Sequence, residues 1–275
     1  MRKNIAAVLL TVLLLGIGVS FIFPFLFMLS SSFKPLGEIM VYPIKYIPRN
    51  PTFQNYHTVF FTPLLNFGRW YINTLVMEAH ILVLKTIVVT LTGYAFAKIK
   101  FFARDVIFLV LLSALMIPSD IMIIPRYIIF SRIHIIDTHW SMIFPYMFDI
   151  YFVFLIRQFF ITIPESLTEA AEIDGCNHFM IYSRIIIPLS MPAVLTMILF
   201  TFVWAWNDYM MPYIFINSVD KQMLSVGMNL FAVGIRQDYG AQLAAATIIL
   251  IPIFVVFLFS QKYFVEGIAT SGMKG

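Results

Sequence analysis

Long apolar stretches separated by short polar segments dominate the chain. A helix that crosses the ~30 Å hydrocarbon core of a bilayer needs about twenty mostly apolar residues, because each residue advances it by ~1.5 Å. The pattern therefore predicts an all-α, polytopic membrane protein with six transmembrane helices. The expected spans are Ile5 to Ser30, Ile72 to Ala97, Val106 to Pro125, Ser141 to Phe160, Met191 to Ile216 and Leu243 to Phe264.

The connecting segments predict a single transmembrane domain over residues 1–275. Residues 33–69 are interrupted by prolines and have no helical period long enough to cross a bilayer, so we expect an exposed loop there. The N-terminus begins like a signal peptide, but its apolar run is too long and has no clear small-residue cleavage site. It is expected to remain as the first span.

Composition supports a membrane protein and excludes an ordinary soluble one. Apolar residues make up 61% of the chain and charged residues 12%, whereas soluble domains carry roughly 25% charged residues. The net charge of +4 is spread thinly, without a basic run that would neutralise a nucleic-acid backbone. Membrane lipid is therefore an expected partner and nucleic acid is not.

The most polar helix-forming segment, SLTEAAEIDGCNHF, begins at Ser166 between the fourth and fifth expected spans. Ser166 and Glu169 have the spacing of a capping box, which predicts that a helix begins there. Gly175 stands where a left-handed residue would end it. The residues expected on one face of this two-turn helix are Leu167, Ala170, Ala171 and Asp174. A second helix is expected from Asn177 to about Ile187.

From the residues alone, two interpretations of this segment remain open. Small alanines let another backbone approach closely, and carboxylates pair with arginines across an interface, which indicates a docking helix. The alternative is an amphipathic connector on the membrane surface. Four acidic residues and no Lys or Arg between Gln158 and Ser183 disfavour it, because anionic lipid repels such a segment.

Ionisable residues within the expected spans are candidates for a translocation path, because a charge at the bilayer centre costs roughly 2.5–3.5 kcal/mol. Glu78 and Lys85 are seven residues apart on the second span, about 10 Å along its axis, so a direct ion pair is not expected. Both are expected to face a cavity or a partner subunit. The other candidates are Asp149, Trp204, Asn207 and Asp208. Helix packing and capping at a break before Pro212 is the alternative for Asn207 and Asp208.

Two kinds of site are set aside. His134, Asp137 and His139 lie close together but lack the spacing of a zinc motif such as H-E-x-x-H, so no metal site is predicted. The chain also has no phosphate-binding loop of the G-x-x-x-x-G-K-[ST] type. We therefore expect no enzymatic activity and no cofactor in this chain.

Four segments resemble one known family. EAAEIDGCNHFMIYSRIIIP resembles the EAA signature of membrane subunits of ATP-binding-cassette importers, with Ile187 where leucine is usual. NTLVMEAHILVLKTIVVTLTGYAFAKIKF, TFVWAWNDYMMPYIF and QKYFVEGIATSGMKG resemble the second span, fifth span and C-terminal tail of the carbohydrate-uptake branch. Together they cover most of the chain from Asn73 onward. They are similar to the shorter, six-span permease subunit of maltose-type importers.

The resemblance implies a role for each segment. Residues 161–190 would carry a cytoplasmic coupling helix that docks on an ATPase, and the tail at 265–275 would reach toward the same partner. The implied docking residues are Glu169, Ala170, Ala171, Asp174 and Gly175. Both termini would be cytoplasmic in the plasma membrane of a prokaryote, an orientation that counting Lys and Arg in the loops does not decide.

The resemblance also implies the partners. They are a second homologous permease subunit, two copies of a cytoplasmic subunit that binds ATP and magnesium, and an extracytoplasmic solute-binding protein. The cargo would be a sugar, with an oligosaccharide favoured, whose hydroxyl groups and ring face meet the polar and aromatic candidates above. The competing hypothesis is an ion-gradient-driven secondary transporter or channel that uses Glu78, Lys85 and Asp149 as an ion relay.

Overall fold

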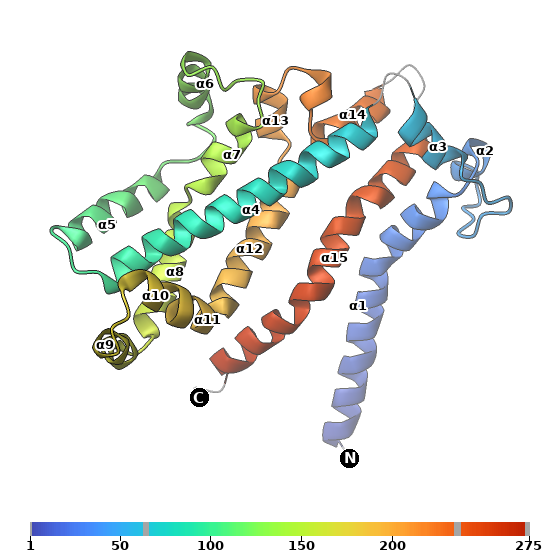
Figure 1. Cartoon of the computed structure of the whole chain (residues 1–275). Coiled ribbons are helices and arrows are strands. Elements are labelled where there is room, and N and C mark those ends of the chain that lie inside the picture. Colours follow the sequence, from blue (N-terminus) through green and yellow to red (C-terminus); the bar gives the residue numbers. More distant parts are fainter. Residues whose placement is uncertain (1, 63–65, 234–237, 273–275) are drawn as a thin grey trace. The chain divides into compact units, whose positions relative to one another are not determined.

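The computed structural model describes residues 2–62, 66–233 and 238–272, with side chains described for 7–62, 66–229 and 238–261. Its described residues form helices and connecting loops (Figure 1). The α-helices are α1 (Arg2–Ser32), α2 (Leu36–Ile39), α3 (Gln54–Phe61), α4 (Phe67–Lys98), α5 (Arg104–Ser113), α6 (Ile123–Arg132), α7 (Trp140–Met147), α8 (Ile150–Thr162), α9 (Glu165–Ile173), α10 (His178–Ile181), α11 (Ile187–Leu189), α12 (Met191–Trp206), α13 (Met210–Phe215), α14 (Leu224–Val233) and α15 (Tyr239–Gly272). Short 3-10 turns occupy Ala114–Met116 and Val219–Lys221, and a π-helical turn occupies Tyr182–Ile186.

Five of the six expected spans correspond to helices, or to a bent helix pair, that are long and apolar enough to cross a membrane. Four are single segments, at Ala7–Ser32, Phe67–Lys98, Trp140–Thr162 and Tyr239–Gln261. The third of these joins α7 and α8 across a short break at Phe148 and Asp149. The fifth is the pair His178–Leu189 and Met191–Trp206, bent by 78° at a short break. The helix therefore runs through Pro188 to Leu189, two residues beyond the end that the sequence predicts. The expected span from Met191 to Ile216 is shorter than predicted, because α12 ends at Trp206 and α13 is a separate helix.

The expected third span, Val106 to Pro125, is not one helix. Helix α5 ends at Ser113, a 3-10 turn follows, and Ile117 is extended before Pro118. Proline disfavours the helical conformation in the residue before it and has no amide hydrogen to continue the helical ladder. The apolar run is therefore split between α5 and α6.

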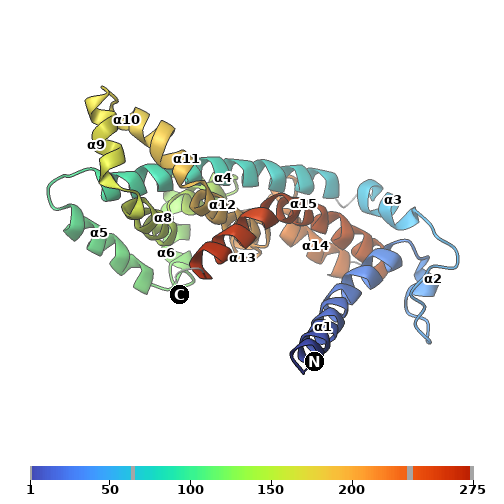
Figure 2. The same cartoon turned by 90° about the horizontal axis from the view of Figure 1, so that it is seen from below.

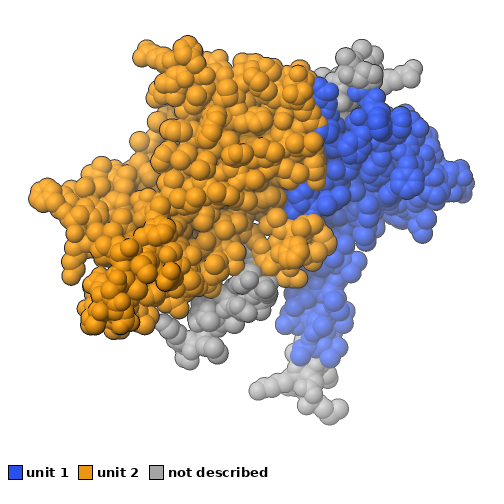
Figure 3. All heavy atoms as spheres, viewed as in Figure 1, with its two compact units in different colours: residues 1–68, 226–253 blue, residues 69–225, 254–275 orange. Residues whose placement is uncertain are grey.

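The chain divides into two compact units (Figure 3). Unit 1 comprises Met1–Gly68 and Val226–Ile253. Within it, the expected loop after α1 contains the short helices α2 and α3 and is held by buried polar groups. Lys34 donates to the Ser31 hydroxyl (3.0 Å) and the Lys45 carbonyl (2.5 Å). Asn55 donates to the Lys34 carbonyl at 2.8 Å, which ties α3 to the end of α1.

Unit 2 comprises Arg69–Ser225 and Phe254–Gly275. Two clusters of buried apolar side chains lie along α4. One surrounds α8 and includes Val89, Phe152, Ile156, Phe160 and Val194, and we call it the α8 core. The other includes Met77, Ile81, Phe130, Met142 and Phe215. Helices α9 and α10 lie near the C-terminal end of α4, and α13 lies toward its other end (Figures 1 and 2).

Helices α4 and α8 approach closely at a glycine. A Cβ atom on Gly93 would lie 2.9 Å from the Cγ2 atom of Ile156 and 3.4 Å from the Arg157 amide nitrogen. Arg157 also donates to the Phe96 carbonyl at 3.1 Å. Only a residue without a side chain permits this packing at unchanged spacing.

Candidate translocation cavity and docking helix

A cavity of about 610 Å³ opens within unit 2 where two helices are broken. It lies beside the breaks between α7 and α8 and between α12 and α13. Its polar and aromatic lining residues are Ser119, Asp120, Arg126, Tyr146, Asp149, Tyr151, Trp204 and Asp208. A hollow lined by ionisable groups is unsuited to hydrocarbon, so it is suited to face water or another subunit.

Asp149 is held at the cavity wall by three interactions. Its carboxylate pairs with the Lys85 ammonium of α4 at 2.7 Å. It also caps α8, accepting from the amides of Tyr151 (3.0 Å) and Phe152 (3.3 Å). The Lys85 side chain is 1% exposed and that of Asp149 is 23% exposed. The ion pair therefore links α4 to the start of α8 and leaves one side of Asp149 toward the cavity.

The expectation that Glu78 and Lys85 face a cavity or a partner is wrong. Both are buried inside unit 2, and neither lines the cavity. Lys85 turns to Asp149, whose position at the start of α8 could not be read from the spacing along α4. The two carboxylate oxygens of Glu78 have no hydrogen-bond partner among the described residues.

Asp208 occupies the break between α12 and α13, which the sequence analysis places before Pro212. Its carboxylate accepts from the Tyr146 hydroxyl at 3.0 Å and from the Met211 amide at 3.1 Å. Asn207 instead donates to the Val203 carbonyl of its own helix at 2.7 Å and is not a lining residue. Of this polar pair, only Asp208 reaches the cavity.

Trp204 presents an aromatic face at the cavity. Its side chain is 47% exposed, and its ring lies 6.4 Å from that of Tyr151 at an angle of 51°. Trp140 is similarly exposed, at 50%, but is not a lining residue. The buried Trp70 and Trp206 serve packing.

Helix α9 begins at Glu165, and its N-cap residue is Pro164 without a side-chain capping bond. The expected capping box of Ser166 and Glu169 is therefore not formed. Pro164 already fixes the chain in an extended conformation before the helix, so the turn starts one residue earlier. Glu165 then lies in the first turn, where a carboxylate favours the positive end of the helix dipole.

The expected end of α9 is confirmed. Gly175 has φ +81°, in the left-handed region. The Cys176 amide donates to the Ala171 carbonyl at 2.9 Å and the Gly175 amide to the Glu172 carbonyl at 3.0 Å, which satisfies carbonyls of the last turn. Asn177 then caps the next helix through the Met180 amide, at 2.9 Å.

The expected docking residues do not all lie on one accessible face. Glu169, Ala170, Asp174 and Gly175 are exposed. Ala171 is 7% exposed and belongs to the α8 core, so its place on the docking face is wrong. The sequence predicted which residues share a face of α9, but it could not show which face packs against the rest of the protein. The accessible face also carries Ile173, which is 86% exposed.

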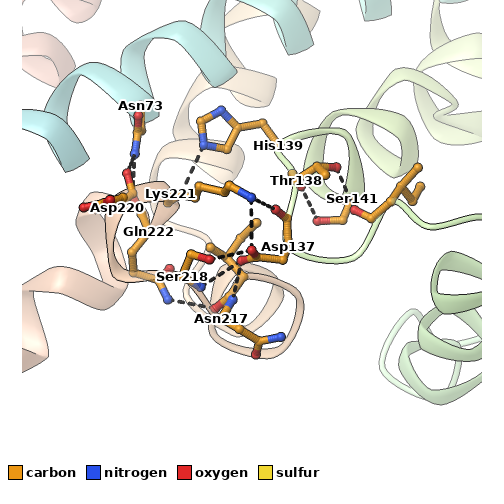
Figure 4. A network of polar contacts seen from close by, with 12 residues as sticks. Asn73, Asp137, Thr138, His139, Ser141, Asn217, Ser218, Asp220, Lys221 and Gln222 are labelled. Atoms are coloured by element: carbon orange, nitrogen blue, oxygen red, sulfur yellow. Dashed lines mark hydrogen bonds and ion pairs between the residues drawn. The ribbon is translucent and has the colours of Figure 1, made fainter.

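Asp137, set aside as a metal ligand, instead joins two loops (Figure 4). Its carboxylate accepts from the amides of Asn217 (2.9 Å) and Ser218 (2.8 Å), from the Ser218 hydroxyl (2.5 Å) and from the Lys221 ammonium (3.1 Å). We call this group the Asp137 clamp. Asn73 of α4 donates to the Asp220 carbonyl of the same loop at 2.8 Å. Asp137 acts as a structural acceptor.

Burial raises the pKa of Asp137, but the hydrogen bonds from Ser218, Lys221 and Asn217 lower it by more, so the net pKa is well below the ordinary value. His80 lies on α4, with its Nδ1 atom 2.7 Å from the Val76 carbonyl oxygen of the same helix. Both side chains therefore serve the fold.

Sequence reasoning missed Asp120, Arg126 and Tyr146 at the cavity. Arg126 carried a usable signal, because it is a lone charge in the apolar run IIPRYIIF. Because Arg126 directly follows the expected third span, it was interpreted as part of a loop and not as a residue inside the protein. Asp120 and Tyr146 lie at helix breaks that the pattern did not predict.

Comparisons with known proteins decide the family. Residues 89–270 match the family model described as "Binding-protein-dependent transport system inner membrane component". The chain belongs to this family. The permease is 31% identical to the arabinooligosaccharides transport system permease protein AraQ of Halalkalibacterium halodurans, over 95% of this chain and 96% of that one. It is 28% identical to the AraQ protein of Bacillus subtilis strain 168, over 99% and 97% of the two chains.

A solved structure shares the fold of the permease. It is described as a bacterial ABC transporter involved in the import of the acidic polysaccharide alginate, and it matches with a TM-score of 0.87 and 22% identity over 96% of this chain and 98% of that one. The permease is thus an all-α membrane protein with the fold of an ATP-binding-cassette importer subunit. Family membership makes it a transport component that works with an ATPase and a binding protein.

Proposed function

We propose that this permease conducts a sugar, with an oligosaccharide favoured, through the cavity lined by Asp149, Tyr151, Trp204 and Asp208. The observation that carries the proposal is the pairing of an exposed indole face with hydrogen-bonding side chains in one hollow. Ring faces stack on aromatic side chains, and sugar hydroxyls match carboxylate and guanidinium groups. The names of the AraQ relatives, which concern arabinooligosaccharides, support the same class of cargo.

The proposed cycle is mechanical. A binding protein delivers the sugar at the extracytoplasmic side, a second homologous permease subunit completes the path, and two copies of a cytoplasmic ATPase bind ATP and magnesium. In this proposal both termini lie in the cytoplasm of a prokaryotic cell. The expected contact of the tail at 265–275 with the ATPase falls on residues whose side chains lie outside the described part.

The accessible face of α9 is the proposed docking surface for the ATPase. Glu169, Ala170 and Asp174 are exposed beside Ile173, which combines carboxylates with an apolar anchor. Such a mixture is typical of protein interfaces. The ion-relay hypothesis loses its main support, because Lys85 and Asp149 are occupied with each other and with the start of α8.

Uptake by the complete transporter in proteoliposomes tests the sugar proposal. We expect uptake of maltotriose or arabinotriose to require ATP and the binding protein and to survive collapse of the proton gradient. Trp204→Ala is expected to raise the KM for uptake about ten-fold, and Trp204→Phe to restore most of it. Trp140→Ala, equally exposed outside the cavity, is the control. Equal effects of the two alanine variants, or uptake driven by an ion gradient alone, would contradict the proposal.

Cross-linking tests the docking surface. In a Cys176→Ala background, Ala170→Cys is expected to cross-link to the ATPase in inside-out vesicles, while the buried Ala171→Cys does not. Labelling of Ala170→Cys by an impermeant thiol reagent added outside intact cells would overturn both the docking face and the orientation.

A further inference from the structure

Acidic side chains outnumber basic ones on the wall of the cavity. Three lining residues are acidic, Asp120, Asp149 and Asp208, and one described lining residue, Arg126, is basic. Lys85 neutralises Asp149 from behind at 2.7 Å. By formal charge, two carboxylates then remain against one guanidinium, so acidic groups still outnumber basic ones on the wall.

The arrangement of these charges also matters. Asp208 is oriented by the Tyr146 hydroxyl and the Met211 amide. The Arg126 guanidinium approaches the Met211 sulfur at 3.5 Å. It makes no ion pair within 4 Å with a carboxylate of the described residues. The cavity thus offers both acceptors and a donor, which suits hydroxyl groups on a neutral ring.

An anionic sugar would be attracted by one lining residue and repelled by others. Its carboxylate or phosphate can bind Arg126, but it must then lie near Asp208 and Asp120, and like charges in a partly desolvated hollow repel. We infer that the cavity selects uncharged, hydroxyl-rich cargo and disfavours sugars that carry carboxylate or phosphate. The inference rests on the proposed function. The shared fold does not determine the charge of the cargo, because the solved structure with this fold belongs to a transporter involved in the import of an acidic polysaccharide.

A chemical probe of the cavity potential tests the inference without a known cargo. In a Cys176→Ala background, Ser119→Cys and Met210→Cys each place one thiol at the cavity wall. The rates of modification by an anionic and a cationic methanethiosulfonate reagent are measured in the complete transporter. Each ratio is divided by that of free 2-mercaptoethanol, which removes the intrinsic difference between the reagents.

We expect the cationic reagent to be favoured about ten-fold at both positions, the scale of electrostatic focusing in a charged cleft. High salt reduces this preference. Asp120→Asn is expected to lower it several-fold, and the matched Asp105→Asn, an exposed acidic residue that is not a lining residue, is expected to leave it unchanged. A normalised ratio near one, a preference for the anionic reagent, or no reaction at either thiol would overturn the inference.

The assay is independent of transport. ATP-dependent sugar uptake together with an anion-preferring cavity would refute the charge selection alone. A cation-preferring cavity in a transporter driven by an ion gradient would refute the proposed function alone. Uptake of trigalacturonate as fast as that of maltotriose would also refute the selection while leaving the importer assignment intact.

Discussion

At the scale of single residues, two buried ionisable side chains on α4 have opposite surroundings. Lys85 has a partner in Asp149, whereas the Glu78 carboxylate has no hydrogen-bond partner among the described residues. Removing one member of a buried ion pair leaves the other uncompensated, but replacing a buried carboxyl group that has no such bond removes no native interaction. The two positions should therefore respond differently to neutralisation.

We predict that Lys85→Met lowers the stability of the permease by about 3 kcal/mol and reduces assembly with its partners. Glu78→Gln is expected to leave the melting temperature unchanged or to raise it. Thermal unfolding of the purified protein in detergent, followed by fluorescence size exclusion, measures both. A stable, fully assembled Lys85→Met variant would show that the pair with Asp149 does not support the fold.

Gly175 gives a second prediction at this scale. Its φ of +81° is strained for any residue with a Cβ atom, although a Cβ there would meet no atom within 4 Å. We expect Gly175→Ala to destabilise the end of α9 by about 1 kcal/mol and to weaken ATPase attachment. Gly37→Ala, equally open but inside a helix, is the control and should be neutral. Hydrogen exchange at residues 170–176 is the measurement.

At the scale of elements, the contact of α4 with α8 depends on Gly93. We predict that Gly93→Ala costs about 1–3 kcal/mol through overpacking against Ile156. Gly18→Ala on α1, where a Cβ meets nothing, is the control in thermal unfolding. Ile156→Ala combined with Gly93→Ala should cost less than the sum of the two single changes, because it removes the clashing methyl group. Additive losses would mean that the two helices do not meet at this point.

The elements also show what the sequence could predict. Period and length predicted the helices that begin near Ile72, Ser141 and Leu243, since a long apolar run has few alternatives in a bilayer. The same criterion of apolar length wrongly predicted one helix across α5 and α6, because it ignores the effect of Pro118 on the conformation of Ile117. Gly175 was predictable as a local requirement of the backbone.

The candidate site was less predictable than the helices. Asp149, Trp204 and Asp208 were identified because polar or aromatic groups at membrane depth are unusual. Glu78, Lys85 and Ala171 were misplaced because spacing along one helix does not reveal what packs against it. Tyr146 reaches the cavity through tertiary packing, for which the chain carries no local signal, whereas the lone charge of Arg126 in an apolar run was a signal that the sequence analysis did not use.

At the scale of the whole molecule, the Asp137 clamp connects segments about eighty residues apart in the sequence. The pKa of Asp137 is lower in the folded protein than in the unfolded chain. Its stabilisation is therefore complete above the unfolded pKa of about 4 and is lost as the pH falls toward the folded value. Acid should loosen the two loops that it joins.

We predict that Asp137→Asn lowers the melting temperature at pH 7 and that its difference from the wild type shrinks steadily below about pH 4. Melting curves from pH 7 to pH 3 measure this. Asp105→Asn, whose carboxylate is 69% exposed, is the control. If the difference in melting temperature stayed constant from pH 7 to pH 3, the effect of Asp137→Asn would come from altered packing and not from the loss of the carboxylate charge.

The inward side of α9 has a mechanical consequence. Ala171 lies within the same apolar packing as Phe160, Ile181 and Val194. Close-packed interiors have low compressibility and transmit strain. If the proposed ATPase docks at Ile173, a displacement applied there would deform the base of α9 little and would move the helices packed around it.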